Sequence, residues 1–258
     1  MPSNVWGHLS LALAFLSRFP TKQTASAQNL AAALPYFALA SLILGLGLTL
    51  PTASIAKLLA SHLKLDLLVY LLAAWLWLAL EVYLTRALHW DGLADLTDAL
   101  GSNQSGPKFW LIIKDSRLGT FGALGLILVL FGQFLAITAH IAAQNYVILI
   151  LAPVFARQAP FWLAKNCPAS QNSSLGALFS ASVAQNKALN AQASIIFVAL
   201  PLLLLGFVHL FQILLLLLSQ ILIIQRLKKI ALQNGGLSGD FCGAAIELSQ
   251  LNFLLLTL

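Results

Sequence analysis

The amino-acid sequence predicts an all-α, polytopic integral membrane protein with about seven transmembrane helices. Three observations lead to this prediction. Hydrophobic residues make up 60% of the 258 residues. Charged residues make up only 9%, whereas soluble domains carry about 25%, and the mean hydropathy is +0.89. The apolar residues fall into runs of about 20 residues, which is the length that crosses a hydrocarbon core. We therefore expect residues 1–258 to form a single membrane domain.

Short polar stretches separate the expected spans. An apolar stretch over residues 5–16 is short for a span, so it either crosses the membrane or lies on its surface. Pro51 is expected to end the first span, and the long run 190–226 is expected to divide near Gly206. The expected spans are residues 30–50, 66–88, 120–143 and 145–163, the two halves of 190–226, and a last helix that ends at Leu258.

The basic residues indicate the orientation of these helices. If the acidic stretch that follows residue 88 is cytoplasmic, Lys57 and Lys64 lie outside, and the other Lys and Arg residues lie on the cytoplasmic side or at helix ends there. This distribution follows the positive-inside rule. The net charge of +6 comes from residues scattered between apolar runs. We therefore expect the lipid bilayer as a partner, and no nucleic acid.

The polar stretch HWDGLADLTD, residues 89–98, carries three of the eight acidic residues. In a helix over residues 92–100, Asp91, Asp95 and Asp98 lie at i, i+4 and i+7 and share one face. Like charges repel in this arrangement, and a divalent cation would reverse the sign. Mg²⁺ binds carboxylate oxygens and bridges them to phosphate groups. The spacing therefore predicts that Asp91, Asp95 and Asp98 hold Mg²⁺.

A structural alternative exists for this stretch. Asp91 would be a helix N-cap and Asp95 a first-turn acid favoured by the helix dipole. That alternative leaves Asp98 without an explanation.

Residues 114–117, KDSR, supply the basic groups that a phosphate-transfer site needs. Lys114 and Arg117 would bind phosphate oxygens, and Ser116 lies between them. Asp115 would act as a further metal ligand or as a general base. The alternative is a solvated helix entrance with a Ser or Asp cap.

The glycine-rich stretch NGGLSGD, residues 234–240, precedes the last helix. Gly236 and Gly239 would let the backbone approach an anion closely, with the Ser238 hydroxyl beside them. Asp240 would close the metal site from this helix.

Charged residues within apolar helices are costly and are therefore functional candidates. Glu81, Arg157 and Glu247 are of this kind, and a structural ion pair between some of them is the alternative. His89 would be a metal ligand or a proton carrier, or else a histidine with structural partners.

Three motifs together closely resemble the cobalamin synthase family, the adenosylcobinamide-GDP ribazoletransferases. They are LHWDGLADLTD (88–98), KDSRLGTFG (114–122) and GGLSGDFCGAAIEL (235–248). FLSRFP (15–20), Arg157 and the Leu175-Gly176 pair also fit this family. Ser238 stands where Thr is usual, and residues 172–174 lack the acidic or charged residue expected there.

This resemblance implies an enzyme of the bacterial or archaeal cytoplasmic membrane, the inner membrane in Gram-negative cells, with its active-site loops on the cytoplasmic face. It implies Mg²⁺ as cofactor, and adenosylcobinamide-GDP and α-ribazole, or its 5′-phosphate, as substrates. The ribose 3′-hydroxyl of α-ribazole attacks the phosphorus on the cobinamide side, and GMP leaves. On this basis the expected catalytic residues are Asp91, Asp95 and Asp115, and the expected substrate contacts are Lys114, Ser116, Arg117, His89, Arg157, Gly236, Ser238, Gly239 and Glu247.

Two other classes of membrane protein also use clustered or intramembrane carboxylates. A CDP-alcohol phosphotransferase also uses clustered aspartates, but its motif differs in spacing from residues 91–95 and includes an Arg that is absent here. A cation transporter would need carboxylates along a path across the bilayer, whereas the acids here gather at one face. A homo-oligomer is compatible with the sequence.

Overall fold

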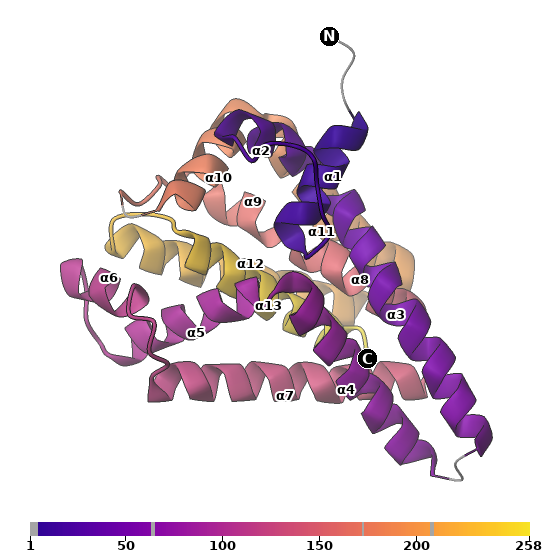
Figure 1. Cartoon of the computed structure of the whole chain (residues 1–258). Helices are drawn as coiled ribbons and strands as arrows, with labels where there is room; N and C mark the ends of the chain where they lie inside the picture. Colours follow the sequence, from indigo (N-terminus) through magenta and orange to yellow (C-terminus); the bar gives the residue numbers. More distant parts are fainter. Residues whose placement is uncertain (1–4, 63–64, 172, 207–208) are drawn as a thin grey trace.

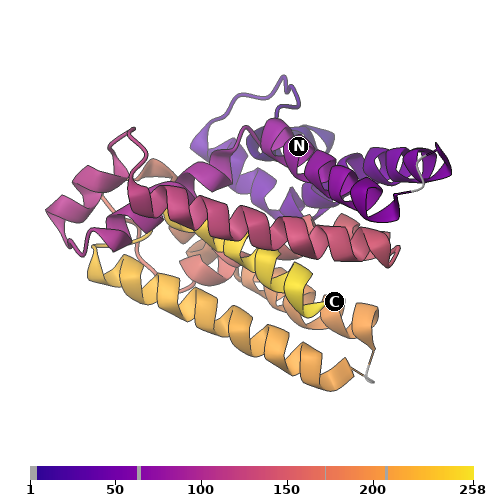
Figure 2. The same cartoon turned by 90° about the horizontal axis from the view of Figure 1, so that it is seen from below.

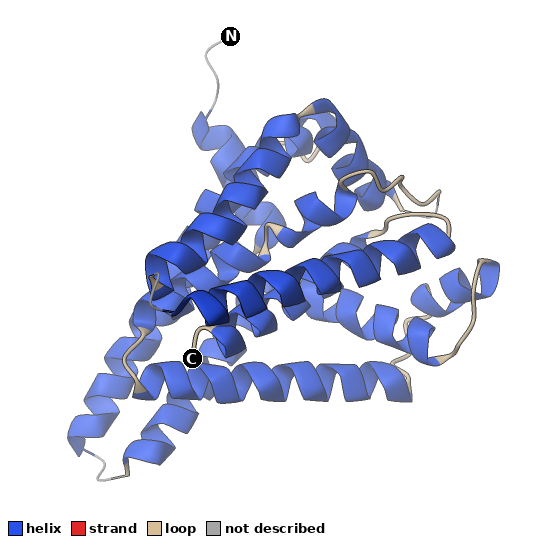
Figure 3. Cartoon of the chain, turned by 180° about the vertical axis from the view of Figure 1, so that it is seen from behind, coloured by secondary structure: helices blue, strands red, loops and turns tan. Residues whose placement is uncertain are grey.

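A computed structural model describes residues 5–62, 65–171, 173–206 and 209–258 of the chain (Figure 1). Within these ranges the chain is helical, and its β-structure is a single bridge between Ala169 and Leu237 (Figure 3). The predicted all-α class is confirmed. The helices are α1 (Val5–Leu16), α2 (Ala27–Ala33), η1 (Leu34–Tyr36), α3 (Phe37–His62), α4 (Asp66–Thr85), α5 (Leu88–Gly101), α6 (Pro107–Ile113), α7 (Thr120–Ala142), α8 (Tyr146–Ala156), α9 (Ala159–Ala164), α10 (Ser174–Gln185), α11 (Lys187–Leu205), α12 (Leu210–Gln233) and α13 (Gly239–Leu256).

Six helical segments in the described ranges are long and apolar enough to cross a membrane. They are Ala27–His62, Asp66–Thr85, Thr120–Ala142, Tyr146–Ala164, Lys187–Leu205 and Leu210–Gln233. The seventh expected span is the helix α13, which does not reach the same apolarity because it carries several polar residues. α1 has 12 residues and is shorter than a span.

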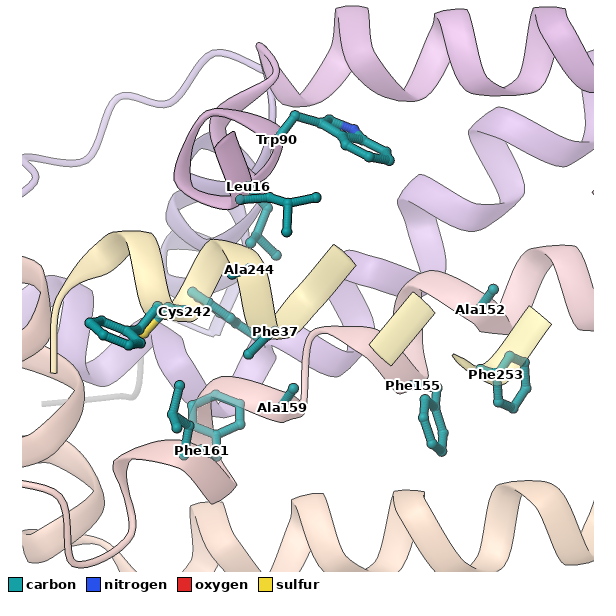
Figure 4. Close-up of a cluster of buried hydrophobic side chains, with 14 of the residues drawn as sticks. Leu16, Phe37, Trp90, Ala152, Phe155, Ala159, Phe161, Cys242, Ala244 and Phe253 are labelled. Atoms are coloured by element: carbon teal, nitrogen blue, oxygen red, sulfur yellow. The ribbon is translucent and has the colours of Figure 1, made fainter. Parts of the chain in front are cut away.

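α13 lies in the centre of the molecule, between α7 and α12 (Figure 2). Twelve of the 18 residues of this helix are buried. Phe253 of α13 stacks on Phe155 of α8 with 4.6 Å between ring centroids (Figure 4). The ring centroid of Phe155 also lies 4.7 Å from that of Phe197 of α11. Since lipid is as apolar as these side chains, such close packing stabilises the bundle through van der Waals contact.

One expected boundary is wrong. Pro51 does not end the first span, because α3 continues through it to His62. A proline removes one backbone hydrogen bond, and a helix packed on its neighbours along its length tolerates that loss. The expected span 145–163 is confirmed as the segment Tyr146–Ala164, which contains a turn at Arg157 between α8 and α9. The expected division of the run 190–226 at Gly206 is confirmed, since α11 ends there.

The turn between α4 and α5 sets the direction of α5, the helix that carries the acidic residues. Arg86 and Ala87 both have left-handed backbone angles, with φ of 59° and 54°. Non-glycine residues adopt this conformation at a cost of roughly 1 kcal/mol each. The Arg86 side chain donates to the carbonyls of Ala14 and Phe15 at the end of α1. This contact ties the strained turn to the N-terminal helix.

Two glycines of α3 provide a matched test of helix packing. An added Cβ at Gly45 would lie 2.0 Å from the carbonyl oxygen of Ile150 in α8, whereas one at Gly47 would meet nothing within 4 Å. We expect Gly45→Ala to lower the free energy of unfolding by about 1–3 kcal/mol through overpacking. Gly47→Ala should leave it unchanged or raise it slightly. Denaturant unfolding in detergent micelles measures both, and equal effects would contradict the α3–α8 contact.

Candidate active site

The acidic face predicted from the sequence forms on α5. Asp91, Asp95 and Asp98 all lie on this helix, at the end of the molecule where α7 begins (Figure 1). Asp91 is exposed, and Asp95 and Asp98 are partly buried. The predicted i, i+4, i+7 arrangement is therefore confirmed.

Two glycines bring α5 against α13. An added Cβ at Gly92 of α5 would lie 2.8 Å from the Cα atom of Asp240, and one at Gly243 of α13 would lie 2.9 Å from the carbonyl oxygen of His89. Each glycine therefore meets the backbone of the other helix, and any larger residue would push the helices apart. This crossing places Asp240 beside the acidic face of α5.

The electrostatics of the site confirm that the carboxylates are close together. Partial burial raises the pKa of Asp95 to about 7, and the negative charges of Asp91, Asp240 and Asp98 add to the shift. Burial also raises the pKa of Asp240, while a hydrogen bond of 2.9 Å donated by the Ser238 hydroxyl partly offsets this. The cluster is thus an unbalanced concentration of negative charge, which a cation would stabilise.

These carboxylates do not form a ready-made cage for a metal ion. Within the residues that the structure describes, no three His, Cys, Asp or Glu side chains lie close enough to hold an ion by themselves. Mg²⁺ commonly binds through one or two carboxylates, with water and substrate phosphate completing its shell. The oxygen donors of Asp91, Asp95 and Asp240 fit that type of site.

Asp98 has a role that the sequence did not indicate. Its two carboxylate oxygens accept hydrogen bonds of 2.7 Å from the backbone N–H groups of Gly119 and Gly122. These amides lie at the start of α7, so Asp98 caps a neighbouring helix rather than its own. An added Cβ at Gly119 would overlap the Asp98 carboxylate, which explains the glycine there. Both oxygens of Asp98 are therefore engaged by amides.

The KDSR loop reaches the same end of the molecule. Arg117 donates to Asp115, with 2.6 Å between Nη2 and Oδ2, and this contact holds the pKa of Asp115 at about 2. Both residues line a cavity of about 500 Å³ together with Asp98. Lys114 and Ser116 are exposed on the same loop. The structure therefore brings the basic loop to the acidic helix, as the sequence predicted.

The glycine-rich loop makes its close approach to another loop of the protein. Gly236 has φ of 127°, and an added Cβ would lie 2.6 Å from the backbone of Ala169. Leu237 donates to Pro168 and accepts from Ser170. The backbone N–H of Gly239 donates to the Ser173 hydroxyl. This pairing fixes the start of α13, while an anion contact by Gly236, Ser238 or Gly239 stays a prediction.

A small cavity of about 110 Å³ lies at the crossing of α5 and α13. Asp91, Asp240 and His89 line it, and apolar residues such as Phe37 and Phe179 form the rest of its wall. Carboxylates in an apolar surrounding interact more strongly with charge than they would in water. The predicted residues His89, Asp91 and Asp240 are thus brought together.

Arg157 and Glu247 lie deeper, in a buried polar network. Arg157 is fully buried and pairs with Glu81 at 3.3 Å, which is the structural ion pair that the sequence left as an alternative. Gln250 donates to both oxygens of Glu81, and its own oxygen accepts from Arg157. A direct substrate contact by Arg157 therefore finds no support in its position.

Gln133 links this network to Glu247 through a hydrogen bond of 3.1 Å. Glu247 lies 3.6 Å from Nδ1 of His89, so the network extends to the edge of the acidic site. The sequence analysis did not single out Gln133 or Gln250. The available signal was a pair of amides within helices whose other residues are mostly apolar.

A comparison with protein-family models decides the family. The model described as cobalamin-5-phosphate synthase matches residues 8–258. The chain belongs to this family.

Curated relatives agree with this family assignment. An adenosylcobinamide-GDP ribazoletransferase of Nitratidesulfovibrio vulgaris strain Miyazaki F is 35% identical over 98% of this chain and 95% of its own length. One from strain DP4 is 39% identical over 66% of each chain, a match that spans just under two thirds of that relative. One from Syntrophobacter fumaroxidans is 33% identical over 72% of this chain and 74% of its own length. No solved structure matches the chain.

The different roles of Asp95 and Asp98 can be separated by stability. Asp98→Asn removes one acceptor and the charge at the start of α7, so we expect the free energy of unfolding to fall by about 0.5–2 kcal/mol. Asp95→Asn removes like-charge repulsion, so stability should stay the same or rise by a few tenths of a kcal/mol. Denaturant unfolding of both variants checks this difference. A stability loss for Asp95→Asn equal to that of Asp98→Asn would contradict it.

The buried network can be tested by removing its cation. Arg157→Met leaves the carboxylate of Glu81 buried without its partner, which we expect to cost about 3–5 kcal/mol of unfolding free energy. Adding Glu81→Gln removes the stranded charge and should recover part of that loss. A double-mutant cycle in detergent micelles measures the coupling. Additive effects of the two substitutions would show that the pair contributes no coupling energy.

Proposed function

We propose that this chain transfers the adenosylcobinamide-phosphate group of adenosylcobinamide-GDP to α-ribazole or its 5′-phosphate, with release of GMP. The family assignment and the names of the relatives support this reaction. The observation that carries the proposal is the crossing of α5 and α13 at Gly92. There Asp91 and Asp240 line one cavity, and both influence the charge of Asp95. The basic loop 114–117 lies at the same end of the molecule.

We propose Mg²⁺ as the cofactor, held by Asp95 of α5 and Asp240 of α13 next to Asp91, with water and substrate phosphate completing its shell. The support is the chemistry of the donors, which are all carboxylate oxygens, and the raised pKa of Asp95, which comes from burial and from the neighbouring negative charges. When bound, the cation would neutralise charge on the pyrophosphate of the substrate. Asp98 is not assigned to the metal, because its oxygens already accept from two amides.

The remaining residues of the site position the phosphate groups. Asp98 anchors the start of α7, which keeps the preceding loop with Arg117 next to α5. Arg117 and Lys114 would bind phosphate oxygens, Arg117 through its planar fork. We assign Asp115 to the orientation of Arg117, since a carboxyl with a pKa of about 2 is a poor base at neutral pH.

The reaction requires one proton acceptor. The 3′-hydroxyl oxygen of α-ribazole forms a bond to the cobinamide-side phosphorus, the bond from that phosphorus to the bridging oxygen breaks, and GMP leaves with this oxygen. The hydroxyl proton passes to a carboxylate of the acidic cluster that does not hold the cation. Asp91 and Asp240 line the small cavity at the crossing of α5 and α13.

The multi-pass membrane character follows from the six apolar segments among the described residues. We propose the cytoplasmic membrane, the inner membrane in Gram-negative cells, as the location, with the acidic site on the cytoplasmic side. The distribution of basic residues supports this orientation. Oligomerisation stays a prediction.

The proposal is tested by turnover of the purified protein in detergent. With adenosylcobinamide-GDP, α-ribazole and Mg²⁺, we expect GMP release and a joined corrinoid product detected by mass spectrometry, both abolished by EDTA. Asp95→Asn should lower kcat by at least about 100-fold, because charge stabilisation at phosphate groups dominates such reactions. Gly47→Ala, whose added Cβ meets nothing, is the control and should retain full turnover. Normal turnover by folded Asp95→Asn would overturn the assignment.

A further inference from the structure

A second, larger cavity lies next to the acidic site. It has a volume of about 730 Å³ and is bounded by the loop that follows α9, one face of α10 and the first turns of α11. On α11 its lining residues Lys187, Asn190 and Ser194 follow helical spacing, so they project from one face. The sequence analysis gave no role to these residues.

The cavity is cationic. Lys165 and Lys187 line it, and no Asp or Glu is among its lining residues. In the part of the chain that the structure describes, neither lysine forms a salt bridge. Lys228 of α12 adds a third cation, since its ammonium group donates to the carbonyl of Lys165. Two free ammonium groups at one cavity would attract an anion with several oxygens.

The wall of this cavity also has a hydrogen-bonding group without a partner. Ser180 donates to the carbonyl of Cys167, and Ser194 donates to the carbonyl of Asn190, so both hydroxyl groups are engaged. Among the residues that the structure describes, the buried Oδ1 atom of Asn190 finds no hydrogen-bond partner. Leaving such an acceptor unsatisfied is unfavourable. Asn190 lines the cavity, so a rotation of its amide would let Oδ1 accept from a hydroxyl group of a bound ligand.

The position of the cavity connects it to the acidic site and to the membrane. Cys167 lines the cationic cavity, Cys242 lines the small cavity beside Asp240, and the two thiols are close enough to interact electrostatically. The other end of α11 continues into the apolar span that ends at Leu205. The cationic cavity therefore lies near the small cavity of the acidic site, at the polar end of the spanning helix α11.

We infer that this cavity binds a phosphate ester whose organic part carries hydroxyl groups. The two ammonium groups would hold the phosphate, and the Asn190 amide would accept from a hydroxyl. A nucleoside monophosphate and the headgroup of phosphatidylglycerol both have this chemistry. The inference does not depend on the proposed function, because none of its residues belongs to the acidic cluster.

Binding measurements with two probes test this site. Radiolabelled GMP is titrated by equilibrium dialysis against the full chain in neutral detergent, with EDTA present so that metal-dependent binding at the aspartates does not contribute. In parallel, phosphatidylglycerol retained from mixed-lipid nanodiscs is counted by native mass spectrometry. The variants are the double substitution Lys165→Ala with Lys187→Ala, and Asn190→Leu. The control is Lys57→Ala, because Lys57 lines a different cavity, of about 400 Å³.

We expect the double lysine variant to bind one of the two probes at least tenfold more weakly than the unmodified protein. Asn190→Leu should bind the same probe several-fold more weakly, and Lys57→Ala should bind it with unchanged affinity. Loss of GMP binding would identify a nucleotide site, and loss of phosphatidylglycerol would identify a lipid site. If neither probe depends on Lys165 and Lys187 in folded protein, the inference is wrong. Asp95→Asn should bind both probes normally, so failure of the proposed reaction would leave this result unaffected.

Discussion

The close crossing of α5 and α13 is the contact on which the candidate site depends. Gly92 and Gly243 each lie against the backbone of the opposite helix, at separations that no larger side chain permits. This contact gathers carboxylates from two distant parts of the chain, Asp95 and Asp240, against their mutual repulsion. The packing of the surrounding helices must therefore supply the energy that holds the negative charges together. A bound cation would remove that repulsion.

The central helix α13 connects this site to the interior of the bundle. Its polar residues are not exposed to lipid but find partners on the neighbouring helices, as Gln250 does with Glu81 and Glu247 with Gln133. In a bilayer an unsatisfied polar group is costly, so each of these bonds favours one arrangement of the helices over others. The network ends at His89, two residues before Asp91 of the acidic cluster. The position of the site is thus specified by polar contacts as well as by packing.

The sequence predicted the features that depend on local spacing. The helix carrying Asp91, Asp95 and Asp98 follows from the i, i+4, i+7 pattern, and the spans follow from apolar length. It did not predict what Asp98 contacts, because the amides of Gly119 and Gly122 come from another helix. It placed a break at Pro51, where packing on α8 and α4 instead keeps the helix continuous. The amides of Gln133 and Gln250 stand out within apolar helices, but their partners come from other helices, so local spacing could not predict their roles.

The most direct test of the account is binding of Mn²⁺, used as a spectroscopic substitute for Mg²⁺, followed by electron paramagnetic resonance of the protein in detergent. The account predicts that Asp95→Asn and Asp240→Asn each weaken Mn²⁺ binding at least about tenfold, because each removes one charged ligand. Asp98→Asn should bind Mn²⁺ with nearly unchanged affinity, since Asp98 caps α7. Unchanged binding by Asp240→Asn would contradict the claim that α5 and α13 build one cation site.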